Sequence, residues 1–415
     1  MGHTPRSQAV PLCALLLVSL APVFAACGGS SNPLADKPYD ATDQVRLAGA
    51  DSGRKADPSK PLEVTASGGD RITDVTATDA AGRYVKGELA PDGSRWHSTG
   101  ALAAGAHYTV RVSTEDEDGA QGRRTIGFDT NPADRLLRVA FGPQSGTYGV
   151  GQPITAELSE PVQDPVARAV VERTLHVESQ PAVQGAWHWV DNRTLHYRPA
   201  EYWPAHATID VRATLDGIKV GGGLYGGPSK PVRLTTGDRV EAVTDAAGHY
   251  MTVMKNGETL RTIPVTTGKP GYATRNGVKV ILGRESFVRM RGTSIGIAEG
   301  SEDAYDLPVY WATRVTWSGE YVHAAPWSEG SQGMDNVSHG CTGMSTANAK
   351  WFFDNVRVGD VVKVVGSAGA TMTPFDNGFG DWNMPWKQWR EGSALVAGKR
   401  EGTGPADVAR LRPEL

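Results

Sequence analysis

One cysteine and two histidines near the C-terminal end carry the residue types that nucleophilic catalysis requires. Cys341 directly follows His339 and Gly340, and His323 lies eighteen residues before the cysteine. Residues 328–337 are rich in Gly, Ser and Asn, so we expect a loop there rather than a helix or a strand. Such a loop can bring His323 back beside Cys341. A thiol needs a neighbouring base because the thiolate is the attacking species and is scarce at neutral pH.

The composition indicates a folded protein without an obvious nucleic-acid partner. The chain has 415 residues, of which 39% are hydrophobic, and a net charge of −4. This balance gives no excess of basic residues for binding phosphates. The 50 glycines and 26 prolines favour many turns and short strands over long helices.

The N-terminus indicates an export signal. His3 and Arg6 form a weakly basic start, and residues 11–26 are almost continuously apolar but too short to favour a membrane-spanning helix. Small residues precede Cys27 and a flexible polar run follows it, which resembles a bacterial lipoprotein cleavage site. The resemblance implies cleavage before Cys27 and lipid on its sulfur, which would hold the protein on a membrane surface. The alternative is an ordinary signal that leaves Cys27 free.

The remaining cysteines make Cys341 a candidate for chemistry. Cys13 leaves with the leader and Cys27 would carry lipid, so Cys341 has no partner for a structural disulfide. A lone thiol in an oxidising compartment is a liability unless it is used. A buried inert cysteine is the alternative. The polar neighbours Ser338 and Thr342 favour the chemical interpretation.

An internal repeat predicts two tandem immunoglobulin-like sandwiches. At an offset of 99 residues, Asp92–His97 aligns with Asp191–His196, and Ala106–Val112 aligns with Ala205–Val211. The aligned segments lie among short alternating runs separated by Gly, Asp, Asn and Pro, as in sandwich domains.

The region that holds the cysteine is predicted to be mostly β, with one helix. A hairpin is expected at Asn256-Gly257. A helix is expected from Ser345 to about Val358, with Ser345 as its cap and Gly359 suited to its end. If this helix points its N-terminus at the sulfur, its dipole would favour the thiolate.

The predicted fold class is therefore mainly β: two tandem immunoglobulin-like sandwiches, a β-rich catalytic domain with a short helix after the cysteine, and a Trp-rich C-terminal subdomain. We expect Trp382, Trp386 and Trp389 in that last part to pack onto the third domain. The predicted boundaries are 1–27 for the leader, 28–45 for a flexible tether, 46–135 and 136–238 for the sandwiches, 239–366 for the catalytic domain, and 367–415 for the C-terminal subdomain and tail.

The pattern around the cysteine resembles one enzyme family. Residues 321–327 read Tyr-Val-His-Ala-Ala-Pro-Trp, and residues 338–341 read Ser-His-Gly-Cys after a polar loop. This combination is similar to the signature of the L,D-transpeptidases, cysteine enzymes that cross-link bacterial peptidoglycan. The resemblance extends over residues 242–390, and the order of domains looks like that of the actinobacterial members.

The resemblance implies a role for each matching residue. Cys341 would be the nucleophile, and His323 the general base and acid, held by the carbonyl of Ala324. His339 would take part in catalysis or support the loop. Tyr305 would lie near the reacting carbonyl. The other positions implied to bind substrate or the oxyanion are Met290, Trp327, Ser338, Gly340 and Gly343.

Gly343 departs from the family pattern. Many members carry Asn two residues after the cysteine, as a side chain that contacts substrate. Glycine offers only backbone groups, so this contact must be absent or replaced. The detail of substrate binding is in doubt at this position, but the nucleophile is not.

The implied reaction is a two-step transfer that needs no metal and no cofactor. Cys341 would acylate on a tetrapeptide stem with release of D-Ala, and an amine of a second stem would resolve the thioester as a 3→3 cross-link. Carbapenem-type β-lactams would acylate the same sulfur. The alternatives are an L,D-carboxypeptidase that uses water as acceptor, and a non-catalytic, lipid-anchored wall-binding protein. A sortase-like enzyme fits poorly, because it expects a longer His-to-Cys separation and an essential Arg after the cysteine.

Overall fold

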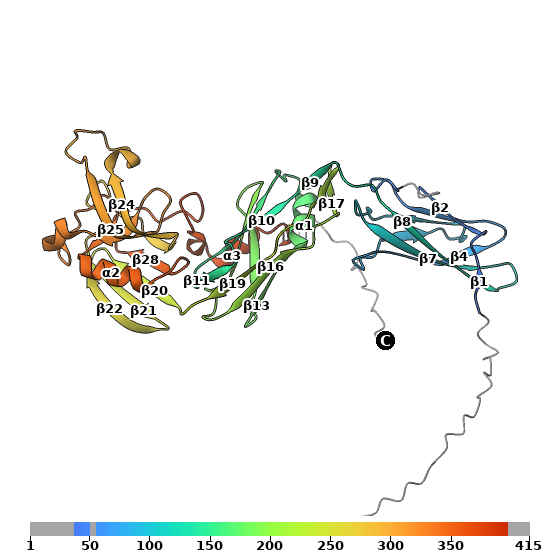
Figure 1. Ribbon diagram of the computed structural model, residues 1–415, viewed down its shortest axis with the longest axis horizontal. Coiled ribbons are helices and arrows are strands. Elements are labelled where there is room, and N and C mark those ends of the chain that lie inside the picture. The colour runs from blue at the N-terminus through green and yellow to red at the C-terminus, as the bar shows by residue number, and fades with distance from the viewer. Residues whose placement is uncertain (1–36, 50–54, 397–415) are drawn as a thin grey trace, which may run out of the picture.

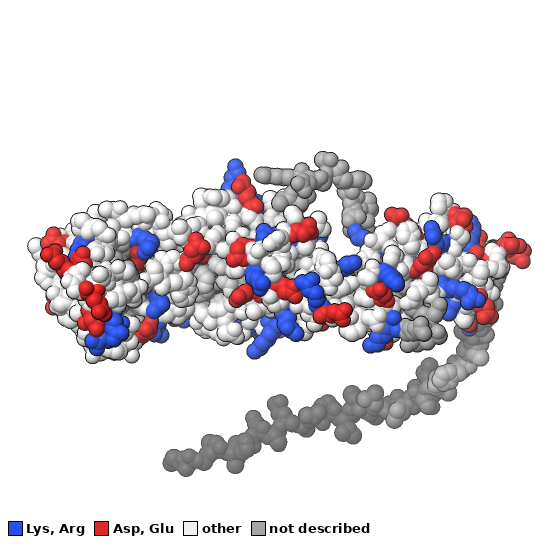
Figure 2. Space-filling view, turned by 90° about the horizontal axis from the view of Figure 1, so that it is seen from above, with Lys and Arg blue, Asp and Glu red and all other residues white. Residues whose placement is uncertain are grey.

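The computed structural model describes residues 37–49 and 55–396, and it places three domains one after another along a long axis (Figure 1). The predicted leader and Cys27 lie outside the described residues. Within these residues, every helix is too short or too polar to cross a membrane. Acidic and basic side chains are interspersed over the visible face of all three domains (Figure 2). The predicted mainly β fold class is confirmed.

The first domain is a sandwich of two four-stranded sheets, with strand orders β1-β8-β7-β4 and β2-β3-β6-β5. The first strand begins at Tyr39, so the range 28–45 predicted as a tether already contains sandwich residues. β1 pairs in parallel with β8, and the Tyr39 hydroxyl hydrogen-bonds Asp70 and Thr114. The strands are β1 (Tyr39–Asp40), β2 (Val45–Ala48), β3 (Glu63–Ala66), β4 (Arg71–Asp79), β5 (Gly87–Leu89), β6 (Arg95–Ser98), β7 (His107–Glu115) and β8 (Gln121–Asp129).

The second domain repeats this arrangement with the strand orders β10-β12-β15-β14 and β11-β19-β16-β13. A small sheet, β17-β18-β9, and one helix, α1 (Pro165–Arg173), complete it. The strands are β9 (Arg135–Leu137), β10 (Val139–Gly142), β11 (Gly146–Tyr148), β12 (Ile154–Leu158), β13 (Leu175–Gln180), β14 (Gly185–Trp189), β15 (Thr194–Pro199), β16 (Thr208–Ala213), β17 (Lys219–Gly221), β18 (Leu224–Gly226) and β19 (Val232–Thr236).

The aligned segments of the sequence repeat occupy equivalent places. β6 and β15 are each third in one sheet, and β7 and β16 are each third in the other. Asp92 accepts a hydrogen bond from the Ser94 N–H, and Asp191 accepts one from the Arg193 N–H. The same aspartate therefore shapes the same turn in both sandwiches.

The third domain packs a five-stranded sheet, β22-β21-β20-β28-β23, with a four-stranded sheet, β24-β25-β26-β27, around one core. The predicted hairpin turn is confirmed: Asn256 and Gly257 both have positive φ, as a type I′ turn requires. The strands are β20 (Val240–Asp245), β21 (Tyr250–Lys255), β22 (Glu258–Pro264), β23 (Gly277–Val280), β24 (Gly283–Arg291), β25 (Asp306–Arg314), β26 (Tyr321–Ala324), β27 (Thr342–Met344) and β28 (Val361–Val365). The short 3-10 helices of this domain and the tail are η1 (Gly292–Ile295), η2 (Pro326–Ser331) and η3 (Asp381–Asn383).

The predicted helix forms but ends early. Helix α2 spans Thr346–Asn355, and the Ser345 hydroxyl caps it by accepting from the Asn348 N–H at 3.3 Å. Val356 has φ −117° and ψ 163°, so the chain is already extended before Gly359. Gly359 instead has φ +93° and forms the turn into β28.

The prediction that Trp382, Trp386 and Trp389 pack onto the third domain is wrong, because their contacts are with the second sandwich. The C-terminal segment joins that sandwich to the third domain. The Asn383 side chain accepts from the N–H of Val278 and donates to its carbonyl. Helix α3 (Trp386–Glu391) lies against β14, where Trp389 Nε1 donates to the Ala186 carbonyl at 2.9 Å. The buried guanidinium of Arg198 lies over the rings of three tryptophans, Trp382, Trp386 and Trp389, at 4.9, 5.5 and 4.4 Å.

Candidate active site

Two neighbouring parallel strands bring His323 and Cys341 together. His323 lies on β26, and Cys341 directly precedes β27. His323 is paired with Gly343 across the two strands, and Cys341 lies two residues before Gly343. Because side chains alternate along a strand, the imidazole and the sulfur lie on the same face of the sheet.

The connection between them was predicted to be a loop, but it begins with the 3-10 helix η2. Pro326 suits the first helical position, since it has no N–H to leave unpaired. The rest of the connection is pinned by Asn336. Its Oδ1 accepts from the N–H and the hydroxyl of Thr267, both at 2.8 Å, and its Nδ2 donates to the Ala246 carbonyl at 2.8 Å.

A cavity of about 250 Å³ contains both candidate catalytic side chains. Eight of the nine predicted residues of the third domain line it, and Gly340 does not. The residues that line it are Thr266, Met290, Tyr305, Leu307, Val309, His323, Ala325, Trp327, Ser328, Val337, Ser338, His339, Cys341 and Gly343.

His323 is set up as a neutral base. Its side chain is buried, and Nδ1 lies 2.7 Å from the Ala324 carbonyl oxygen. A carbonyl can only accept, so Nδ1 carries the proton and Nε2 keeps its lone pair. Burial lowers the pKa of His323 below its ordinary value, against the opposing effect of this hydrogen bond. The Trp327 ring stacks on the imidazole at 6.0 Å.

Cys341 is a neutral thiol in this state. Its Sγ donates to the Gly319 carbonyl at 3.6 Å. Burial raises the pKa of Cys341 to about 12, and the Tyr321 N–H partly opposes this rise. Helix α2 begins five residues after Cys341, because β27 and Ser345 lie between them, and this is about 16 Å along an extended chain. Since a helix dipole acts only near the first turn, this separation along the chain gives no support for a dipole effect on the thiolate.

The turn before the nucleophile is closed by Ser338. Its hydroxyl donates to the Cys341 carbonyl at 2.6 Å and accepts from the Gly340 N–H at 3.1 Å. Gly340 has φ +121°, a region that favours glycine. Gly340 was expected to offer its N–H to the oxyanion. In the structure this N–H is engaged by Ser338 and the residue does not line the cavity, so Gly340 is not a free oxyanion donor.

His339 and Tyr305 form one wall of the cavity. The His339 ring lies between Tyr272 and Tyr305, with ring centroids at 4.7 and 5.0 Å. His339 Nε2 is 3.5 Å from a carboxylate oxygen of Asp303. Burial, with a smaller contribution from negative charge on Cys341, raises the pKa of Tyr305 to about 12. The phenol therefore stays protonated and can donate a hydrogen bond.

Gly343 has a packing reason to lack a side chain. A Cβ at this position would lie 2.9 Å from Ala325 Cβ and 3.1 Å from Thr266 Cγ2. Both distances are shorter than ordinary carbon contacts. The departure from the family pattern is thus accommodated by the close approach of these two neighbours.

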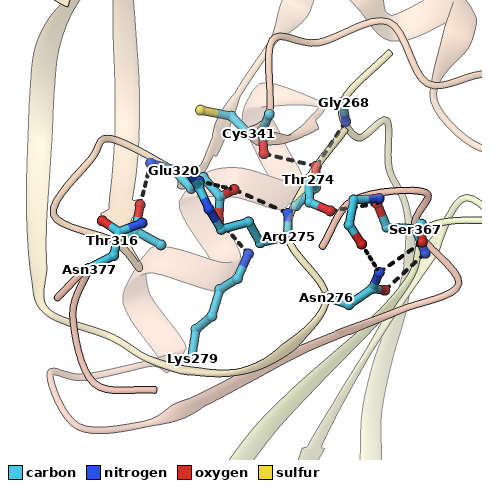
Figure 3. A network of polar contacts seen from close by, with 12 residues as sticks. Gly268, Thr274, Arg275, Asn276, Lys279, Thr316, Glu320, Cys341, Ser367 and Asn377 are labelled. Carbon is cyan, nitrogen blue, oxygen red and sulfur yellow. Dashed lines mark hydrogen bonds and ion pairs between the residues drawn. The ribbon is translucent and has the colours of Figure 1, made fainter. Parts of the chain in front are cut away.

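Sequence reasoning missed a polar network next to the nucleophile, formed by Thr274, Arg275, Lys279 and Glu320 (Figure 3). Glu320 directly precedes the Tyr-Val-His segment, which was the available signal. Lys279 lies between two valines in β23, a pattern that ordinarily places a lysine toward solvent. Within the described ranges, no group of His, Cys, Asp and Glu is arranged to hold a metal ion.

Comparisons with known proteins identify the family of the chain. The family described as L,D-transpeptidase catalytic domain matches residues 239–364, and the family described as bacterial Ig domain matches residues 53–219. L,D-transpeptidase 2 of Mycobacterium tuberculosis is 33% identical over 402 residues, which cover 95% of this chain and 97% of that protein. L,D-transpeptidase 5 of the same species is 31% identical over 400 residues, with coverages of 94% and 86%.

Among solved structures, an L,D-transpeptidase in complex with imipenem is 38% identical, with a TM-score of 0.49, and the match covers 55% of this chain and 100% of that one. A Mycobacterium smegmatis L,D-transpeptidase is also 38% identical, with a TM-score of 0.46 and coverages of 55% and 99%. The extent of the match to L,D-transpeptidase 2, together with the matched catalytic domain, shows that this chain belongs to the L,D-transpeptidase family and is a transpeptidase enzyme.

Proposed function

We propose that this enzyme forms 3→3 cross-links between peptidoglycan stem peptides, with Cys341 as the nucleophile and His323 as its base. The observation that carries the proposal is the shared cavity: a thiol and an imidazole with a free Nε2 lie on one face of the β26–β27 pair. The 3→3 linkage itself is the general activity of the family.

The first step is acylation. The Cys341 sulfur attacks the carbonyl of the third residue of a tetrapeptide stem, and its proton passes to His323 Nε2. The carbon–nitrogen bond to the terminal D-Ala breaks, and the leaving amine takes the proton from His323. The protonated Tyr305 phenol in the cavity wall can donate to the developing oxyanion.

The second step is transfer. A side-chain amine of another stem attacks the thioester, and His323 accepts the proton that the amine loses. The carbon–sulfur bond breaks, and Cys341 recovers its proton from His323. Water in place of the amine would give an L,D-carboxypeptidase through the same thioester.

We also propose that the enzyme works outside the cytoplasm, attached through lipid on Cys27. The two sandwiches lie in line with the catalytic domain, so they would act as a spacer between the membrane surface and the wall (Figure 1). The test is a protein that lacks residues 40–235, expressed in cells. Unchanged cross-linking in those cells would contradict the spacer role.

Incubation with a carbapenem followed by intact-mass measurement tests the nucleophile. A faropenem-derived adduct is reported for Mycobacterium tuberculosis L,D-transpeptidase 3, and we expect one equivalent to add to this protein. The Cys341→Ala variant should take up none, and the His323→Ala variant should react much more slowly while remaining folded. An adduct that survives Cys341→Ala would overturn the proposed nucleophile.

Mass analysis of the products from purified stem peptides tests the reaction. A cross-linked dimer is expected when a tetrapeptide donor and an amine-bearing acceptor are both present. Tripeptide alone, formed equally well without acceptor, would identify a carboxypeptidase instead.

A further inference from the structure

A buried charge cluster lies directly beside the nucleophile. Lys279 is fully buried in β23, and its ammonium group pairs with one carboxylate oxygen of Glu320, which is itself 7% exposed. The other carboxylate oxygen accepts from Arg275 Nη1 at 3.0 Å and from the Arg275 N–H at 3.2 Å. Glu320 therefore has one buried and one half-exposed cation.

Stability alone does not account for such a cluster. The desolvation of two buried charges offsets most of their attraction, so apolar side chains of similar size would serve a core at least as well. Removal of one partner, in contrast, leaves an uncompensated charge. The position of Glu320 indicates what else the cluster does.

The two peptide groups that flank Glu320 both face the sulfur of Cys341. The Gly319 carbonyl accepts from Sγ at 3.6 Å, and the Tyr321 N–H favours the charged form of the sulfur, which lowers the Cys341 pKa. Because Glu320 lies between these two residues, anchoring its carboxylate fixes both peptide groups relative to the sulfur.

Further contacts close the same turn. The Glu320 N–H donates to Thr316 Oγ1 at 2.8 Å, and the Asn377 side chain holds Ser318 through two hydrogen bonds of 2.7 and 2.9 Å. Figure 3 shows the contact between Glu320 and Thr316 on one side and the Thr274 contacts on the other. Thr274 Oγ1 donates to the Gly340 carbonyl at 2.9 Å, so the segment that carries Arg275 also holds the peptide next to Cys341.

We propose that the cluster of Lys279, Glu320 and Arg275 positions the Gly319–Tyr321 turn against Cys341. In the resting enzyme the turn offers a carbonyl to the thiol, and after deprotonation it offers the Tyr321 N–H to the thiolate. Lys279 and Glu320 are positioning residues, and His323 remains the base. The inference rests on the proposed role of Cys341 as the nucleophile.

Alkylation of Cys341 by iodoacetamide between pH 6 and 11 tests the proposal, because it reports on the sulfur without requiring peptidoglycan. The charged and titratable groups around the sulfur are Glu320, Lys279 and Tyr321 on one side, and His323, Tyr305 and His339 in the cavity wall. Of these, the test varies only Glu320 and Lys279.

Glu320→Gln keeps the shape of the side chain and removes the charge that pairs with Lys279 and Arg275. Because the released turn no longer offers the Tyr321 N–H to the thiolate, we expect alkylation at pH 8 to become about tenfold slower, as for a rise of about one unit in the thiol pKa. Lys279→Met removes the other partner of the buried pair and should slow alkylation in the same way. Both variants should lose about tenfold or more in carbapenem acylation, because the turn is no longer held in place.

Lys363→Met is the matched control. Lys363 lies on β28, the strand paired with β23, and is exposed, so its loss should leave both rates unchanged. If Lys279→Met fails to fold, Glu320→Gln and Arg275→Gln keep the test open. Lower melting temperatures with alkylation and acylation rates equal to those of the parent would show a merely structural cluster and overturn the proposal. If Cys341 of the parent is alkylated but the parent forms no cross-links, this result would instead count against the proposed function.

Discussion

At the scale of single residues, the proposed catalytic pair is neutral at rest. Burial lowers the pKa of His323 and raises the pKa of Cys341 to about 12. A preformed thiolate–imidazolium pair is therefore disfavoured, and the proton must move when substrate is in place. A thiol of this kind resists oxidation and adventitious alkylation, because both reactions require the thiolate.

This neutrality predicts the pH dependence of acylation. His323 must be unprotonated to act as a base, so the rate should fall only on the acid side, with a midpoint below pH 6.5. The rate should be flat between about pH 7 and 9, because the Cys341 pKa lies far above that range. Single-turnover acylation by a carbapenem, followed from pH 5 to 9, measures both features. An acid limb centred above pH 6.5 would contradict the assigned base.

The contacts of Gly343 predict a steric cost at this position. Gly343→Ala places a methyl group 2.9 Å from Ala325 Cβ, so the strands must shift, which typically costs about 1–3 kcal/mol. Chemical denaturation should show this loss of unfolding free energy. Gly330→Ala is the control, since a Cβ there meets nothing within 4 Å. Equal stability of the two variants would show that the space beside Gly343 is open.

At the scale of elements, the site depends on a connection that is held at several points. Asn336 ties it to Thr267 and Ala246, and its Oδ1 also lies 3.2 Å from His249 Nδ1. The Gly333 N–H donates to the Val265 carbonyl at 3.0 Å. The connection thus fixes the distance between β26 and the nucleophile turn.

Loss of the Asn336 side chain should loosen this connection. Asn336→Ala removes several partly buried hydrogen bonds and leaves their partners unpaired, a cost of about 1–3 kcal/mol. We expect a lower melting temperature, faster hydrogen exchange over residues 326–338, and slower carbapenem acylation. Glu329→Ala, at an exposed position of the same segment, is the control and should change none of these. Unchanged exchange in Asn336→Ala would show that other contacts hold the connection.

Local patterns predicted the local elements, and long-range partners escaped them. The hairpin at Asn256-Gly257 and the start of helix α2 at Ser345 follow from signals within a few residues. The burial of Lys279 could not be predicted from such local signals, because its partner Glu320 lies 41 residues away. The register that places His323 beside Gly343 is likewise a property of two strands. His323 and Cys341 were predictable as a pair because their residue types, rather than their surroundings, identify the chemistry.

At the scale of the whole molecule, the second sandwich and the catalytic domain are joined by backbone contacts and by the C-terminal segment. The Gly149 N–H donates to the Val358 carbonyl, and the Gly151 N–H donates to the Gly359 carbonyl, at 2.8 and 2.9 Å. A Cβ at Gly149 would lie 2.1 Å from the Asp360 nitrogen, so this joint requires glycine. The tail could not be placed from sequence, since Met384 meets Arg198 across 186 residues.

The joint contains a titratable group, and it makes stability depend on pH. Asp360 is fully buried, and burial raises its pKa from 3.8 to about 7, against the opposing hydrogen bond from the Arg357 N–H. The folded state therefore holds this proton more tightly than the unfolded state. The resulting stabilisation is fully present below about pH 4 and is lost as the pH rises through about 7.

Asp360→Asn should remove this dependence. The amide is neutral at every pH and can still accept from the Arg357 N–H, so the variant should match the parent at pH 4. At pH 8 the variant should be more stable, by up to about 4 kcal/mol for a shift of about three units. Melting temperatures of both proteins at pH 4 and 8 measure the difference. Asp335→Asn, at an exposed position, controls for the change in net charge. If the melting temperatures of Asp360→Asn and the parent differ by the same amount at both pH values, Asp360 is ionised throughout and the prediction is wrong.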